Sequence, residues 1–185
     1  PAAIMKGWAL IGDNRYDDAQ AALDSIAGGG IEGFLTYYRA LMADVADRRD
    51  AAIGFARDAH DVDPYDVRLL GAYARMLANA SRFDEAKAAI TQYRDQGLSD
   101  PGILALEKEI DTKKRPGKLT PTVQAGAAEM FNSVGAALAR DGTADLAAIY
   151  LHAALYLSPD FDLAAIRLAQ LYSSYGQYDA ANKIY

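Results

Sequence analysis

Apolar and small residues recur along this chain at the spacing of one helix face and, on a longer scale, at intervals of about 34 residues. Near the end of the sequence, Ala165, Leu168, Ala169 and Tyr172 occupy positions i, i+3, i+4 and i+7 of a helix. The same frame recurs one repeat earlier, and again after residue 69. Helices with this period stack through a continuous apolar core, so the pattern predicts an all-α fold, an α-solenoid of antiparallel helical hairpins.

Small residues mark the places where the two helices of each hairpin cross. In the first helices the small residue is Ala74, Gly135 or Ala169, which lets two backbones approach closely. Alanines early in the second helices set the period of the whole chain. These alanines are Ala19, Ala52, Ala86, Ala147 and Ala181.

This order of bulky and small positions resembles the tetratricopeptide repeat (TPR) family. The resemblance covers about four fifths of the chain and is mixed at residues 33–64, where Thr36 and Arg39 stand at positions that are bulky and apolar in the family. It implies a right-handed superhelix in which the first helix of each hairpin lines a concave face.

The repeats predict three segments. Residues 1–100 hold about three hairpins, the first of them truncated; residues 101–120 hold a short helix and a basic loop with Pro and Gly; residues 121–185 hold two more hairpins, the last truncated. Because Pro1 begins inside a repeat and Tyr185 ends inside a helix, we expect the chain to be a fragment of a larger TPR-containing protein.

Composition narrows the range of partners. With 25 acidic and 19 basic side chains, the net charge of −6 repels a phosphate backbone, so we expect no nucleic-acid partner. The absence of cysteine excludes disulfides and thiol nucleophiles. No stretch approaches the ~18 apolar residues of a membrane span. The compartment, cytoplasmic or periplasmic, stays open, and the alanine-rich composition suggests a bacterial source.

The motifs that could carry chemistry lack the required context. Gly28–Gly33 satisfies G-x-G-x-x-G, but it follows a helix and not a strand, so we interpret it as a flexible connection. The acidic clusters at 13–18 and 61–66 lack the spacing of a calcium loop. His60 and His152 lie on different repeats, too far apart to share a metal. We predict no metal, no cofactor and no catalysis in this chain.

One basic cluster, Lys113, Lys114, Arg115 and Lys118, lies in the expected loop. It could touch an anionic lipid surface, an acidic protein or RNA. The interpretation as a solvated linker is favoured, because a charged linker requires no function.

By the resemblance, the exposed residues of the first helices form a peptide- or protein-binding face. Arginine and asparagine there can bind carboxylates and backbone amides of a peptide. The chain lacks the lysine with which some family members hold an acidic C-terminal tail. For Trp8 and Tyr37 the alternative is packing against neighbouring repeats lost with the N-terminus. Carried over position by position, the concave face comprises Trp8, Tyr37, Leu41, Arg68, Arg75, Asn79, Asn132, Arg140, Arg167 and Gln170.

The sequence therefore predicts a non-catalytic interaction module or scaffold that binds a protein segment on its concave face. Two alternatives remain open at this point. The array could associate with itself as a homo-oligomeric scaffold, or it could be the TPR region of a larger enzyme whose catalytic domain lies outside this chain.

Overall fold

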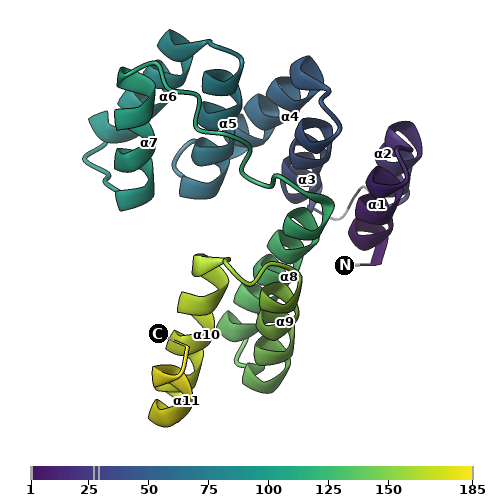
Figure 1. Ribbon diagram of the computed structural model, residues 1–185, viewed down its shortest axis with the longest axis vertical. Coiled ribbons are helices and arrows are strands. Elements are labelled where there is room, and N and C mark those ends of the chain that lie inside the picture. The colour runs from purple at the N-terminus through teal and green to yellow at the C-terminus, as the bar shows by residue number, and fades with distance from the viewer. Residues whose placement is uncertain (1, 27, 29, 185) are drawn as a thin grey trace.

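The structure is a computed structural model that describes residues 2–26, 28 and 30–184. These residues form eleven helices, and there is no strand among them. The prediction of an all-helical solenoid is confirmed, because consecutive helices pack against one another as hairpins (Figure 1).

The first seven helices form one curved stack, which we call the N-terminal array. Each helix packs on the next, most extensively α3 on α4 and α1 on α2. The helices are α1 (Ala2–Gly12), α2 (Tyr16–Asp24), α3 (Glu32–Val45), α4 (Arg49–Val62), α5 (Val67–Asn79), α6 (Phe83–Asp95) and α7 (Pro101–Asp111).

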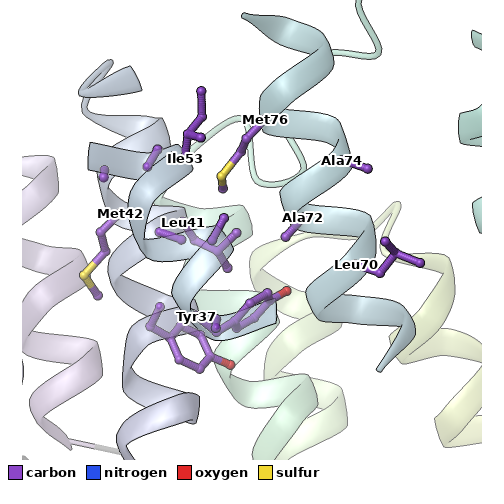
Figure 2. Packing of buried hydrophobic residues seen from close by; sticks show 14 of the residues in the cluster. Tyr37, Leu41, Met42, Ile53, Leu70, Ala72, Ala74 and Met76 are labelled. Carbon is purple, nitrogen blue, oxygen red and sulfur yellow. The ribbon is translucent and has the colours of Figure 1, made fainter. Parts of the chain in front are cut away.

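Apolar side chains of this stack face inward. Figure 2 shows buried residues of α3, α4 and α5, among them Leu41, Ile53 and Met76, gathered between the helices. Leu41 is fully buried and Met76 is nearly so. Removal of this apolar surface from water is the main contribution to stability in such a stack.

Local sequence sets where the helices begin and turn. The Asp66 and Asp100 side chains each accept hydrogen bonds from two backbone N–H groups of the following helix, α5 and α7. Asn14, Asp47 and Ser81 adopt left-handed φ angles of 59°, 55° and 65° in the tight turns inside the first three hairpins. Asparagine and aspartate tolerate this conformation better than most residues.

Helix α7 ends in the same kind of turn, with Lys113 at φ 54°, but the next helix does not follow at once and begins only at Val123. Pro116 lacks a backbone N–H and Gly117 has a φ of +77°, and both disfavour a helix here. Residues 112–122, which we call the strap, instead run back along the array towards α3 (Figure 1).

The last four helices form the C-terminal pair of hairpins. Helix α8 packs on α9, and it also contacts α1 and α3 of the N-terminal array. Gly135 lies at the crossing with α9, where a Cβ atom would stand 2.9 Å from Leu151 Cγ and 3.2 Å from the Ala147 carbonyl oxygen. The helices are α8 (Val123–Arg140), α9 (Ala144–Leu157), α10 (Asp162–Ser174) and α11 (Tyr178–Asn182).

Candidate functional site

Four of the residues predicted on the exposed concave face are buried. Trp8 is 1% exposed, Tyr37 3%, and Leu41 and Asn132 are fully enclosed. The expectation that they face a ligand is therefore wrong for this structure. The physical reasons differ: α8 packs on α1 over Trp8 and reaches Tyr37 through Glu129. Leu41 instead packs among α3, α4 and α5 (Figure 2), and Asn132 lies on α8 itself, where it accepts from Arg167.

Gly126 makes this close contact feasible. A Cβ atom at this position would lie 2.2 Å from the Trp8 ring, so only glycine lets α8 approach the indole. Gly12 and Val123 lie near each other at the beginning of the same contact. Trp8 therefore packs inside the protein, as the alternative interpretation expects. The contact is made by α8, a later helix of the same chain, and not by a preceding repeat.

A buried polar network joins the N-terminal array to α8. Arg68 forms an ion pair with Glu129 and donates a hydrogen bond to Ser133 Oγ at 2.7 Å. Tyr37 donates to Glu129 Oε1 at 3.2 Å, and Tyr38 donates to Ser133 Oγ at 2.9 Å. The predicted ligand-binding residue Arg68 is thus neutralised inside the protein.

The electrostatics agree with this enclosed environment. Burial, followed by the negative charge of Glu129, raises the pKa of Tyr37 well above its ordinary value. The Tyr37 hydroxyl therefore stays neutral and donates to the carboxylate. The Arg68 guanidinium also stacks over the Tyr37 ring, 5.0 Å from its centroid.

Arg75 and Asn79, which the sequence predicts to face a ligand, bind the strap. Arg75 Nη1 donates to the carbonyl oxygen of Pro116 at 2.9 Å. Asn79 donates to the carbonyl oxygen of Gly117 and accepts from its backbone N–H, at 2.8 and 3.0 Å. These residues hold a peptide backbone, and that backbone belongs to the same chain.

Three residues of the basic cluster have partners on the array, although Lys113, Lys114 and Arg115 remain exposed to solvent. Lys118 pairs with Asp47, Lys114 pairs with Glu109 at 2.6 Å, and Arg115 donates to Ser81. The sequence alone did not predict these partners. The available signal was that Asp47 and Ser81 occupy equivalent turn positions in consecutive hairpins.

The three remaining predicted residues line one open groove. Arg140, Arg167 and Gln170 stand around a concavity of about 660 Å³ between α8 and α10, which we call the C-terminal groove. Arg140 and Gln170 are exposed, and Arg167 is half-buried. The residues that sequence reasoning did not include are Ala136, Ala139, Leu151, Leu171, Ser174 and Tyr175.

The C-terminal groove carries positive charge without an acidic residue in its lining. Arg167 donates to the amide oxygen of Asn132 at 2.8 Å, and Arg140 makes no hydrogen bond or ion pair with any residue that the structure describes. Burial, followed by the charges of Arg68 and Arg140, lowers the pKa of Arg167. The groove therefore favours an anionic group.

The histidines and the glycine-rich motif that the sequence singled out lie in packing or turn positions. His60 is buried edge-on to Tyr73, and His152 forms a 2.8 Å hydrogen bond with the Tyr172 hydroxyl. Gly28 and Gly30 have positive φ angles between α2 and α3, whereas Gly29 of the G-x-G-x-x-G motif lies outside the described residues. Within residues 2–26, 28 and 30–184, no cluster of three His, Cys, Asp or Glu side chains could hold a metal ion.

Over the same described part of the chain, no helix combines the length and apolar character needed to cross a membrane.

No protein-family model matches the sequence, and no curated protein matches it. Among solved structures, the chain is similar to MamA AMB-1, with 14% identity and a TM-score of 0.40, over 99% of this chain and 86% of that one. It is also similar to MamA MSR-1, with 13% identity and a TM-score of 0.38, over 97% and 92%. Likeness at this level does not extend to function.

Proposed function

We propose that this chain is a non-catalytic interaction scaffold that binds a segment of another protein in the C-terminal groove. The observation that carries the proposal is the convergence of Arg140, Arg167 and Gln170 on one open concavity whose lining contains no carboxylate. By the family resemblance, Arg140 and Gln170 stand at concave-face positions of the repeat, and Arg167 lies beside such a position.

The lining suits a peptide segment with mixed character. Guanidinium groups bind carboxylates and also donate to backbone carbonyl oxygens. Gln170 and Ser174 can pair with backbone amides, while Ala139 and Leu171 offer apolar surface for a side chain. We therefore expect the bound segment to contain an acidic residue close to an apolar one.

In this proposal the N-terminal array supports the groove and does not take part in it. Tyr37 and Arg68 hold Glu129 and Ser133 on one side of α8, and Asn132 on the same helix holds Arg167. The position of the Arg167 guanidinium is thereby set by residues from three helices.

A selection from a random peptide display library on the intact protein tests the proposal. Selected peptides should lose most of their binding when Arg140→Ala is combined with Gln170→Ala. The matched control is Arg57→Ala with Gln92→Ala, which removes the same residue types from exposed positions on α4 and α6. Peptides that bind the groove variant as tightly as the intact chain would refute the groove as the site.

A second candidate is self-association, and a specific surface favours it. Helix α9 exposes Leu146, Ile149 and Tyr156, whose exposed fractions are 44%, 63% and 87%. The spacing i, i+3 and i+10 places them on one helix face. The outer face of α6 instead exposes Asp84, Lys87 and other polar residues.

An apolar helix face of this kind can pack against the same face of a second copy. Sedimentation over a wide range of concentration distinguishes this candidate. Self-association through α9 predicts a dimer that Ile149→Asp converts into a monomer. A protein that is monomeric at high concentration removes the candidate and leaves the groove proposal unaffected.

A further inference from the structure

The strap occupies the N-terminal array in the manner of a bound peptide. We infer that the surface beneath it is a second binding site, which takes an extended basic segment of a partner protein when the strap is displaced. We call this surface the strap site, and the inference does not depend on the C-terminal groove. Its residues are Asp44, Asp47, Arg75, Asn79, Ser81 and Glu109.

The strap site recognises a backbone. The Asn79 side chain makes two opposite hydrogen bonds to one residue, because its Nδ2 donates to the Gly117 oxygen and its Oδ1 accepts from the Gly117 nitrogen. Arg75 adds a bond to the preceding carbonyl oxygen, that of Pro116. A clamp of this kind holds an extended segment whether or not the segment is part of the same chain.

Charge complementarity defines the class of segment. Lys118 pairs with Asp47 and Lys114 with Glu109, so the cations of the strap meet carboxylates of the array. A cavity of about 140 Å³ lies here, lined by Asp44, Asp47, Arg49, Asn79, Gly117 and Lys118. Inside the described part of the protein, Asp44 Oδ2 is buried without a hydrogen-bond partner.

Departure of the strap would leave Asp44, Asp47 and Glu109 on this surface without the two lysines. These three carboxylates would outnumber the two arginines of the same surface, Arg49 and Arg75, so the vacated site would attract cations. Ser81 would also lose the hydrogen bonds that it accepts from Arg115. The fitting segment therefore has basic residues on both sides of a small residue that can adopt the left-handed φ of +77° seen at Gly117.

The strap can leave because its ends are anchored by other contacts. Helix α7 packs on α5 and α6, and α8 packs on α1, α3 and α9. Between these helices Lys113, Gly117 and Leu119 are exposed, and Thr120 is the buried residue of the strap. Polar contacts at exposed positions contribute little net stability individually, so the strap is held less firmly than the helices.

A slack variant tests the inference in the full chain. Residues 113–119 are replaced by a Gly/Ser linker of twice the length, which adds little loop-closure entropy. The probe is a synthetic peptide with the sequence of residues 112–120, acetylated and amidated, and it is titrated in the NMR spectrum of the labelled protein. A scrambled peptide of equal composition controls for charge alone.

The peptide should bind the slack variant about tenfold more tightly than the intact chain, because in the intact chain the strap competes at high effective concentration. Asn79→Ala in the slack variant should weaken binding about tenfold, since it removes both hydrogen bonds to the backbone. The scrambled peptide should bind more weakly than the native order.

Three results would overturn the inference. In the first, the slack variant keeps its helicity but the peptide causes no shift at millimolar concentration, which makes the strap only a connection. In the second, the scrambled peptide binds equally well, which reduces the site to general charge attraction. In the third, the slack variant unfolds. This result would mean that the strap is needed for folding, so a partner segment could not take its place.

Discussion

The two halves of this molecule are built from the same kind of repeat, but one half covers its predicted ligand-facing residues and the other leaves them open. In the N-terminal array, Trp8 is covered by α8 and Arg75 and Asn79 bind the strap, whereas between α8 and α10 a groove stays open around Arg140 and Gln170. The difference teaches that a residue at a ligand-facing position of a helical repeat is available to a ligand only if no other part of the same chain covers it.

The largest expected loss of stability comes from substitution of Trp8, which is buried, in contrast to the exposed groove residues. Trp8→Ala removes a fully buried indole from the contact with α8, and large-to-small changes of aromatic residues typically cost about 3–5 kcal/mol. Urea unfolding followed by circular dichroism measures the loss. A cost below about 1 kcal/mol would mean that α8 does not cover Trp8.

The next effect concerns the ion pair that holds α8 to the array. Glu129→Ala leaves Arg68, which is mostly buried, without its counter-charge, and we expect a loss of about 3 kcal/mol in the free energy of unfolding. Glu129→Gln is the matched control, because it keeps an acceptor for Tyr37 and should cost less. Equal costs for the two variants would contradict a charge-based contact.

The strap contacts should contribute less than the helix contacts. Arg75→Ala combined with Asn79→Ala removes three hydrogen bonds to the strap backbone, and we expect a cost of about 1–2 kcal/mol. Amide hydrogen exchange should also become faster at Gly117 and remain unchanged in α3. Unchanged exchange at Gly117 would indicate that the strap is held by other contacts.

The buried residue His60 should make the stability of the protein depend on pH. Burial lowers the pKa of His60 below its ordinary value, and the nearby Asp61 and Asp63 only partly offset this. The unfolded chain therefore binds a proton at higher pH than the folded one, so this residue makes stability fall as pH decreases below about 6.5. His60→Gln should flatten the stability profile between pH 7 and 5. A profile as steep as that of the unchanged chain would assign the effect to another group.

The smallest expected change in the free energy of unfolding comes from substitutions in the C-terminal groove. Arg140→Ala with Gln170→Ala removes exposed side chains that make no hydrogen bond to the described residues, so the free energy of unfolding should change by less than about 0.5 kcal/mol. This variant is therefore suited to binding measurements. A loss above about 1 kcal/mol would mean that the groove is closed in solution.

Much of the fold could be predicted from periodicity alone. The spacing of Ala19, Ala52 and Ala86 predicts the hairpins because each small residue must lie where two helices cross, and all three are fully or almost fully buried. The short helix and the loop after it also follow from local chemistry, since Pro101 suits a helix start and Pro116 interrupts a helix.

Of the residues that the sequence predicts to face a ligand, only those of the C-terminal part line an open groove. Local spacing identifies the concave side of each helix, but it does not reveal which distant segment lies on that side. The contact between Trp8 and Gly126 joins positions far apart in the sequence. A hint was present in Gly126, Ala127 and Ala128, a run of small residues that lets α8 approach another helix closely.

The most direct test of the filled N-terminal face uses Trp8, the one tryptophan of the chain. Acrylamide quenching of its fluorescence reports whether the indole is reachable from water. Enclosure by α8 predicts a blue-shifted emission and much weaker quenching in the folded protein than in urea. Emission and quenching close to those of the unfolded chain would show an open N-terminal face and contradict the account.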